Sequence, residues 1–202
     1  LTFGVYFRYD GYNQDSYSLS YYRDENSKTG KTEITNGKDT FYAIYLQDEW
    51  KLLEHLTLYG GLRFDYWHAF DGESGEPDAP LSFDEPHDYA LSPKFSAVWN
   101  PLTDSYIRGS IGRAFRAPNI YELYRTWQGA SGTYYSNPDL DPETLWNFEI
   151  GGEQYFWNRK INLSPTYLHT ELDDAIERYK EGSDYYLDNV SEATVNGVEV
   201  AA

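Results

Sequence analysis

Apolar and polar residues alternate along most of the chain, and this period of two predicts β-strands rather than helices. In "LTLYGGLRFDYW", residues 56–67, one face is apolar and the other is mostly polar. The alternation recurs at residues 3–9, 42–46, 89–99 and 146–150. These segments run for roughly 9 to 14 residues, whereas strands of soluble proteins average about 5 or 6 and a strand that crosses a bilayer needs about 9 to 11. The pattern therefore predicts strands of membrane-crossing length.

The connections between these strands alternate between short and long. We expect eight crossings, with approximate limits 1–10, 40–50, 55–67, 88–99, 104–114, 144–157, 160–180 and 184–200. The long loops lie near 11–39, 68–87 and 115–143, and a tall hairpin lies near 172–192. Short turns at one rim and long loops at the other are typical of outer-membrane barrels. The expected fold is all-β, an antiparallel meander of long strands that forms part of a transmembrane β-barrel.

Tryptophan positions are consistent with two interfacial girdles of such a barrel. Trp50, Trp99 and Trp157 lie beside short connections, whereas Trp67 and Trp146 lie beside long ones. A soluble β-sandwich has no reason to place tryptophan at strand ends. We therefore predict that these five residues lie in the membrane girdles.

The composition restricts the possible functions of the chain more than it restricts the possible folds. The net charge is −17, from 33 acidic and 16 basic residues, which disfavours nucleic acid as a partner. There is no cysteine, so thiolate metal sites and cysteine nucleophiles are excluded. No serine, histidine and acid are grouped as a hydrolase requires, and the adjacent Asp173 and Asp174 point to opposite faces of a strand. We expect neither catalysis nor a cofactor.

Six segments, taken in order, resemble the barrel of TonB-dependent outer-membrane receptors, which import siderophores, haem and cobalamin. They are "AIYLQDEWKL", "LTLYGGLRFDYW", "YALSPKFSAVWNP", "GRAFRAPNIYELY", "NPDLDPETLWNFEIGGE" and "YLDNVSEATVNGVEV". The "FRAP" box (Phe115, Arg116, Ala117, Pro118) and the "NPDL" box (Asn137, Pro138, Asp139, Leu140) look like the family's paired boxes, which flank one extracellular loop.

The resemblance implies a partial barrel over residues 1–202, because a complete member has about 22 strands around a plugged lumen. We expect this chain to be a middle-to-late piece that lacks the plug and the segment that contacts TonB. The implied function is active import of a scarce ligand such as a ferric siderophore across the bacterial outer membrane. The implied partners are outer-membrane lipid, a small-molecule or metal-chelate ligand and, for the full-length protein, the TonB complex.

Residues 112–144 carry no helical or strand period, yet they are rich in aromatic residues, which argues against disorder. The candidate ligand-binding residues in this segment are Arg116, Tyr124, Trp127, Gln128, Tyr134 and Tyr135. Alternatively, the aromatic residues only pack the loop onto its neighbours. In haem importers of the family a histidine lies between the two boxes; residues 119–136 contain none, which disfavours haem.

Other polar groups have a structural and a functional interpretation. His68 and His87 lie at the two ends of one loop and could approach each other, although scattered histidines are more often incidental. The acidic loop at residues 71–78 could attract calcium, but its spacing matches no calcium-binding loop, and we expect no metal. Four charged residues of the lumen face either line a ligand path or contact the plug of the full receptor, or they only keep the interior polar: Arg63, Lys94, Arg108 and Glu149.

Two other classes of protein remain open from the sequence. One is an autonomous, aromatic-rich soluble β domain that binds carbohydrate or acts as an adhesin, with tryptophans gathered on one binding face. The other is a soluble fragment that keeps only some native strand pairings, whose open edges favour self-association.

Overall fold

The computed structural model describes residues 1–202, with every side chain except that of Ser191. One sheet contains nearly all of the secondary structure. The elements in chain order are β1 (Thr2–Leu19), η1 (Glu25–Ser27), β2 (Lys28–Leu53), β3 (Leu56–Gly75), β4 (Leu81–Ser82), β5 (His87–Leu102), β6 (Ser105–Arg116), α1 (Ile120–Tyr124), β7 (Trp127–Gly129), β8 (Gly132–Tyr134), β9 (Glu143–Phe156), β10 (Ile161–Glu181) and β11 (Asp184–Ala201). No helix in the described part of the chain is long and apolar enough to cross a membrane.

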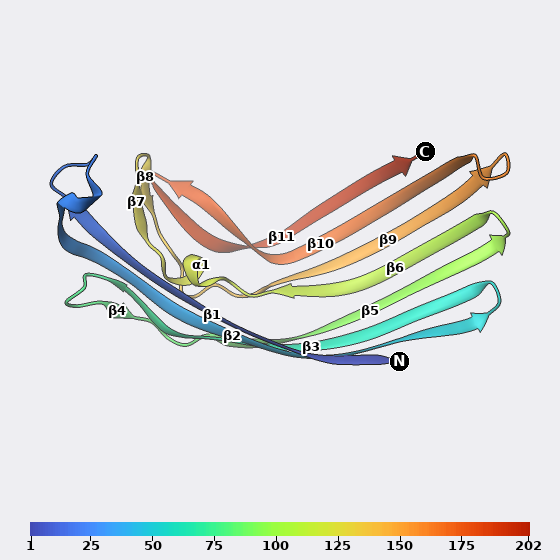
Figure 1. Ribbon diagram of the computed structural model, residues 1–202, viewed down its shortest axis with the longest axis horizontal. Helices are drawn as coiled ribbons and strands as arrows, with labels where there is room; N and C mark the ends of the chain where they lie inside the picture. Colours follow the sequence, from blue (N-terminus) through green and yellow to red (C-terminus); the bar gives the residue numbers. More distant parts are fainter.

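The eight predicted crossings correspond to eight long strands, β1, β2, β3, β5, β6, β9, β10 and β11, in an antiparallel meander. The sheet curves strongly and has a convex and a concave side (Figure 1). The turns β2–β3, β5–β6 and β9–β10 are short and lie at one end, whereas the long connections lie at the other. The predicted fold class is confirmed. Within the described chain the sheet is open, and β1 lies at one end of its strand order.

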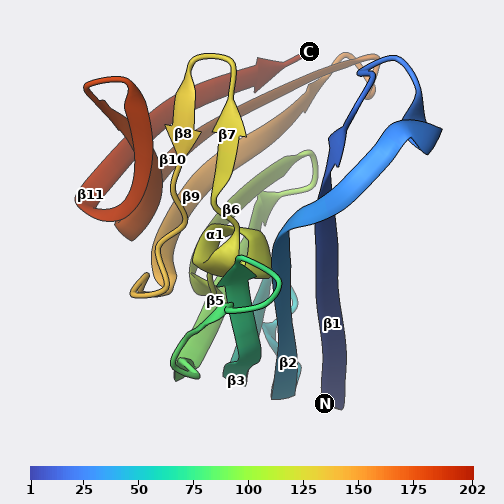
Figure 2. The ribbon, with the colours of Figure 1, turned by 90° about the vertical axis from the view of Figure 1, so that its left-hand side faces the viewer.

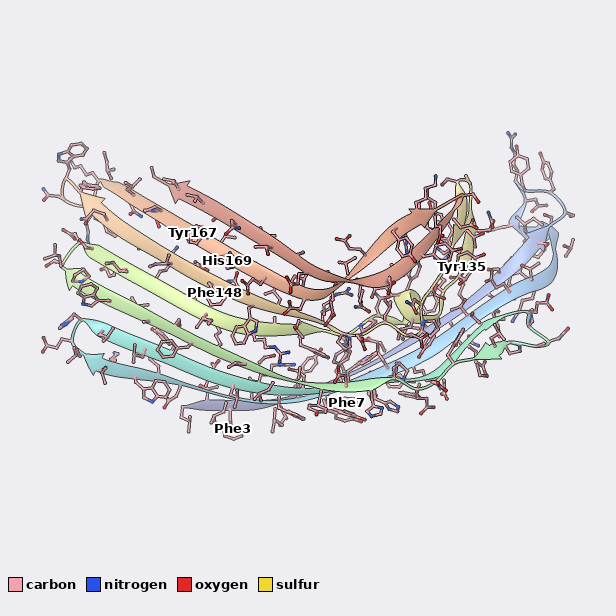
Figure 3. The ribbon with its side chains drawn as sticks, turned by 180° about the vertical axis from the view of Figure 1, so that it is seen from behind. Phe3, Phe7, Tyr135, Phe148, Tyr167 and His169 are labelled. Carbon is pink, nitrogen blue, oxygen red and sulfur yellow. The ribbon has the colours of Figure 1, made fainter. Side chains whose placement is uncertain are left out.

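The convex face is apolar because one residue of every alternating pair points to it. Val5, Ile44, Phe64 and Leu91 are aligned across β1, β2, β3 and β5 by the strand register. All four side chains are exposed, with Val5 at 81%. Figure 3 shows Phe3 and Phe7 projecting from this side of the sheet. Such a band of exposed apolar side chains is what a strand wall facing lipid requires.

Aromatic side chains border the apolar band, but not all of the predicted girdle residues take part. Trp50, Trp99 and Trp157 are exposed near the short turns, and Trp146 stacks on Phe148, which is exposed. Trp67 is only 1% exposed, and its place in the girdle was predicted wrongly. Trp67 follows Arg63 and Asp65 at every second residue of β3, so its side chain points to the same, concave side as theirs. It packs in the core. Its outward-facing neighbour Tyr66 lies near the ring of Tyr42 instead.

Two of the expected loops contain more strand than the sequence pattern indicated. β1 and β2 continue through most of residues 11–39, and the irregular part is confined to residues 20–27 around η1. In the segment 68–87, β3 continues to Gly75 and then pairs with the short β4. The hairpin expected near 172–192 consists of the outer parts of β10 and β11. Strand pairing therefore extends well beyond the apolar band.

The buried core lies on the concave side, at the end with the long connections. Its buried residues are Trp67, Ala69, Ala117, Ile120, Leu123, Tyr124, Leu140 and Leu187. Three of them, Ile120, Leu123 and Tyr124, come from the segment between the two sequence boxes, and Ala117 and Leu140 come from the boxes themselves. Viewed from the end with the long connections, α1 and the β7–β8 hairpin lie in the hollow between β1–β3 and β9–β11 (Figure 2). This segment therefore supplies the core that the open sheet would otherwise lack.

Candidate functional site

The segment 117–142 begins with a short helix that is capped at its first turn. The Asn119 side chain accepts a hydrogen bond from the Glu122 N–H at 2.9 Å, and the Glu122 carboxylate accepts one from the Asn119 N–H at 2.9 Å. This reciprocal arrangement is a capping box, which satisfies amides that a helix start leaves unpaired. The helix α1 is only five residues long. Its cap and its burial, rather than its length, therefore determine its position.

Tyr124 ends α1 and fits into a socket formed by two glycines of the sheet. A Cβ atom at Gly37 or at Gly72 would lie 2.8 Å or 2.5 Å from the tyrosine ring. Phe83 stacks on the same ring at 5.3 Å between centroids. The side chain is fully buried, and burial raises the pKa of Tyr124 to about 12. Tyr124 is thus a core residue, and its predicted role as a ligand contact is corrected.

Arg116 of the "FRAP" box holds two acidic side chains together. Its guanidinium contacts the Glu143 carboxylate at the start of β9 and lies 3.0 Å from the Glu122 carboxylate of α1. Glu143 also accepts the backbone N–H of Ile176 in β10 at 2.7 Å. Burial opposes ionisation of Glu143, but the bonds from Arg116 and Ile176 outweigh it, and the pKa of Glu143 is lowered. Arg116 therefore links β6, α1 and β9 instead of facing a ligand.

The "NPDL" box and the residues after it attach the segment to the β10–β11 hairpin. Asn137 donates to the Leu187 carbonyl at 3.1 Å and accepts from the Asp139 N–H at 3.0 Å. Asn189 of β11 accepts the Asp141 N–H at 2.9 Å and donates to the Asp141 carbonyl. The box is therefore held by side-chain amides that replace strand pairing. Both boxes act as attachment points, as their positions on either side of the loop suggested.

An aromatic ladder lies between these attachment points. The ring of Trp127 stacks on Tyr134 at 4.1 Å, and Tyr134 stacks on Tyr185 at 4.4 Å, with interplanar angles of 6° and 5°. Cations lie over each ring: Arg125 over Trp127, Arg178 over Tyr134 and Lys180 over Tyr185. A cation over an aromatic face is attracted by the ring quadrupole. Cations and π faces are thus concentrated at one place in a strongly acidic chain.

A second ladder forms because β8 pairs along the edge of β11. Tyr134 and Tyr185 are partners in a parallel bridge, and the Tyr135 N–H donates to the Tyr185 carbonyl at 2.8 Å. Successive strand residues point to opposite faces, so Tyr135 stacks on Tyr186 at 4.9 Å on the other side. Figure 3 places Tyr135 at the end of the molecule with the long connections. Two Tyr–Tyr dipeptides, one in each segment, thus lie in register.

The structure places the six candidate ligand-binding residues in different parts of this region. Trp127, Gln128 and Tyr134 lie together on the β7–β8 hairpin, where the Thr133 hydroxyl donates to Gln128 at 2.8 Å, and Tyr135 lies on the opposite face. Arg116 and Tyr124 lie apart from them, in the support of the loop. The sequence analysis missed four residues that meet the ladder: Arg125, Arg178, Lys180 and Tyr185. The repeated "YY" dipeptide at 134–135 and 185–186 was the available signal.

The concave wall below the loop is polar and hollowed. A hollow of about 720 Å³ is lined by residues that include Arg63, Lys94 and Arg113. Arg63 lies 2.7 Å from the Asp65 carboxylate. Arg108 donates to the Thr166 hydroxyl at 2.8 Å, and Glu149 lies 3.8 Å away. These contacts satisfy most of the charges within the wall itself, which favours the structural interpretation of the lumen residues.

The acidic loop does not converge on a metal site. Asp71 is paired with Lys38 at 2.8 Å, across from β2. Among the residues that the structure describes, no group of three or more His, Cys, Asp or Glu side chains is placed to hold a metal ion.

Comparison with known proteins identifies the family. The family described as "TonB dependent receptor-like, beta-barrel" matches residues 1–202. The iron-regulated outer membrane virulence protein of Vibrio cholerae is 30% identical over 158 residues, covering 77% of this chain and 21% of that protein. The ferric enterobactin receptor of Pseudomonas aeruginosa is 25% identical over 195 residues, covering 84% of this chain and 24% of that protein.

Solved structures agree on the fold. The Serratia marcescens hemophore receptor HasR superposes with a TM-score of 0.68 over 98% of this chain and 38% of that chain, at 15% identity. The ferric-catecholate import receptor Fiu of E. coli gives a TM-score of 0.67 over 98% of this chain and 31% of that chain, at 17% identity.

The chain spans about a fifth to a quarter of the length of these curated relatives. The match over every residue leaves the soluble carbohydrate-binding or adhesive module without support. Members of this family are receptors and transporters rather than enzymes, and they reside in the outer membrane of Gram-negative bacteria. The chain belongs to the TonB-dependent receptor family and forms part of its β-barrel domain.

Proposed function

We propose that this chain is part of the barrel wall and outer rim of a transporter that imports a ferric chelate. The apolar convex band contacts outer-membrane lipid, and the concave side lines the lumen. Energy for import comes from the TonB complex, which contacts a part of the receptor outside residues 1–202. The names of two relatives, an iron-regulated outer membrane protein and a ferric enterobactin receptor, support iron as the cargo.

The aromatic ladder is the observation that carries the proposed ligand contact. Trp127, Tyr134 and Tyr185 present stacked π faces at the rim, and three cations lie beside them. Arg125, Arg178 and Lys180 bring three positive charges to the ladder of a strongly acidic chain. Cations beside aromatic faces favour an anionic ligand with oxygen acceptors. Gln128, which is exposed next to Trp127 on β7, adds an amide on the opposite face of the hairpin, beside Thr133.

Uptake by whole cells tests this function directly. The intact receptor is expressed as the sole iron importer in an iron-limited strain, and uptake of radiolabelled iron is measured with one catecholate and one hydroxamate chelator. Trp127→Ala and Tyr134→Ala should each weaken binding by roughly 30-fold, because a central aromatic contact contributes about 2 kcal/mol. Tyr22→Ala is the matched control, since Tyr22 is 73% exposed in the β1–β2 connection.

Each outcome has a distinct meaning. Import of a ferric chelate that is lost in both ladder variants but kept in the Tyr22 variant supports the proposal. Import that is unchanged in the ladder variants supports the transporter function but refutes the ladder as the contact. If a folded receptor imports neither chelate, the ferric-chelate assignment itself is wrong.

A further inference from the structure

Two aspartates lie opposite each other beneath the rim loop, residues 117–142, where β1 runs beside β2. Asp10 and Asp39 are direct partners in the strand register, so their side chains project to the same, concave face of the sheet. Asp39 is only 3% exposed, whereas the Asp10 side chain is about half exposed. Like charges that are directly opposed in a sheet repel each other. The repulsion is relieved when the more buried carboxyl group keeps a proton.

The cations on the neighbouring strands are already paired with other acids. Arg8 of β1 lies 2.6 Å from the Asp10 carboxylate, and Arg63 of β3 lies 2.7 Å from the Asp65 carboxylate. The Oδ1 atom of Asp39 has no hydrogen-bond partner among the described residues. Ionised Asp39 would therefore be a buried charge without a counter-ion of its own, which is costly. Burial and the charge of Asp10 accordingly raise the pKa of Asp39 to about 6, although Arg8 opposes the shift.

The titratable groups packed over this pair are a tyrosine and a glutamate. Tyr124 of α1 has a buried hydroxyl without a hydrogen-bond partner among the described residues. Burial, followed by the charges of Glu85 and Asp39, raises the pKa of Tyr124, so Asp39 lies close enough to act on it. Glu85 itself lies 3.4 Å from the imidazole of His68. Neither Tyr124 nor Glu85 supplies a positive charge that would favour ionised Asp39.

The helix α1 is docked on the strand that carries Asp39. A Cβ atom at Gly37, two residues earlier on the same face of β2, would lie 2.6 Å from the Ile120 side chain and 2.8 Å from the Tyr124 ring. Trp67, on the concave face of β3, also has a buried indole N–H without a partner among the described residues. Ionisation of Asp39 therefore puts a charge into the core on which α1 rests, whereas the neutral acid leaves that core uncharged.

We propose that Asp10 and Asp39 form a proton-operated latch that holds α1 and the rim loop against β1–β3. While Asp39 keeps its proton, the loop stays docked. When Asp39 gives the proton to solvent, undocking relieves the buried charge, because it exposes the carboxylate to water. The docked form holds a proton between pH 3.8 and about 6 that an exposed aspartate has released, so docking is firmest in acid and weakens as the pH rises through about 6. The latch acts on the support of the loop and is independent of which ligand the ladder contacts.

Hydrogen exchange of the intact receptor, folded in detergent micelles, tests the latch. The Leu123 and Asn137 amides report docking, and their protection factors are compared at pH 5 and pH 7.5 after correction for the pH dependence of exchange itself. In the parent protein, protection should fall by roughly tenfold between these pH values, which follows from a pKa of about 6 in the docked form and 3.8 in the exposed form. Asp39→Asn is neutral at both pH values and should keep the same protection at both.

Two further variants separate the latch from other effects of pH. Asp10→Asn removes the opposing charge and frees Arg8 to pair with Asp39, so the fall in protection should become smaller. Asp71→Asn is the matched control and should retain the parent's fall, because Asp71 is an exposed acid on β3 whose left-handed backbone also suits asparagine.

The proposal is supported if the fall in protection disappears in Asp39→Asn and persists in Asp71→Asn. It is overturned if protection in the parent protein does not change with pH. A fall that persists in Asp39→Asn would assign the pH dependence to another group, such as His68, and also overturns the latch. Circular dichroism checks that each variant is folded. Should Asp39→Asn not fold, Asp10→Asn decides, because a fall as large as that of the parent in this variant refutes the role of the pair.

Discussion

Tyr124 provides the sharpest test of how the rim loop is held in place, because its ring and its hydroxyl should have opposite effects. The ring is fully buried, stacks on Phe83, and occupies space that a Cβ at Gly37 or Gly72 would fill. Truncation of a buried aromatic side chain costs about 3–5 kcal/mol. The hydroxyl has no hydrogen-bond partner among the described residues. An unpaired buried polar group costs about 1–3 kcal/mol, so its removal should be neutral or stabilising.

Hydrogen exchange measures both effects at defined amides. The Leu123 N–H donates to Asn119 O, and the Asn137 N–H donates to Glu122 O, so both amides report docking of the loop. Tyr124→Ala should accelerate their exchange by roughly 150-fold or more, the equivalent of at least about 3 kcal/mol, whereas Tyr124→Phe should leave protection unchanged or increase it. Exchange is followed by mass spectrometry on the intact receptor in micelles.

Three comparisons decide the result. Tyr22→Ala, in the exposed β1–β2 connection, should leave exchange of residues 117–126 unchanged. The socket is refuted if Tyr124→Ala keeps the protection of the parent protein. Gly72→Ala should resemble Tyr124→Ala, since its Cβ would stand 2.5 Å from the ring.

Three further predictions concern charge. Asp39 is 3% exposed, and burial together with the neighbouring Asp10 raises its pKa to about 6 from 3.8. Between these values the folded chain binds a proton that the unfolded chain has released, so stability falls as pH rises from about 4 to 6 by up to about 3 kcal/mol. Asp39→Asn should remove this decrease in stability, which is measured as the change of the denaturant unfolding midpoint with pH. The same pH dependence in the parent and the variant would contradict the role of Asp39. Leu46→Arg, on the convex face, should destabilise the barrel by about 2–4 kcal/mol in refolding titrations, whereas Gln47→Arg, on the concave face, should have little effect; equal effects contradict the assignment of the two faces. Glu143→Ala should leave Arg116 and the Ile176 N–H without their shared acceptor and increase proteolysis of residues 117–142; unchanged cleavage contradicts a role for this link.

The strands could be predicted from the sequence because a period of two is a local property. The same alternation predicts the direction of the Trp67 side chain. Trp67 shares a face with Arg63 and Asp65 rather than with Leu62 and Phe64. Trp67 lies at the end of a predicted crossing, which suggests a girdle position, but the alternation of faces along the strand places its side chain inside. Strand continuation through residues 11–39 could not be predicted, because polar strands above a membrane lack an apolar face.

The support of the loop depends on contacts between distant parts of the chain. The burial of Tyr124 requires glycine at positions 37 and 72, on two other strands, and nothing within residues 112–144 reveals this. The capping box formed by Asn119 and Glu122 is a local pattern, but the sequence analysis did not identify it. The stacking of Tyr134 on Tyr185 depends on the edge of β11, which the "YY" repeat indicates only once the two segments are known to be neighbours.

The loop is fastened firmly at both ends and lightly in the middle. At one end Tyr124 is enclosed and Arg116 binds two carboxylates; at the other, Asn137 is bonded to the Leu187 carbonyl of β11. Between them, β8 meets β11 in a single bridge, the Thr133 N–H donates to Asp184 at 2.9 Å, and the Tyr134–Tyr185 and Tyr135–Tyr186 stacks contribute about 0.5–1.5 kcal/mol each. On the proposed function, a ligand ring that offers an equivalent π face would compete with Tyr185 for the ring of Tyr134. Because both ends of the segment are attached to the sheet independently of the ladder, such an exchange would leave the support of the loop in place.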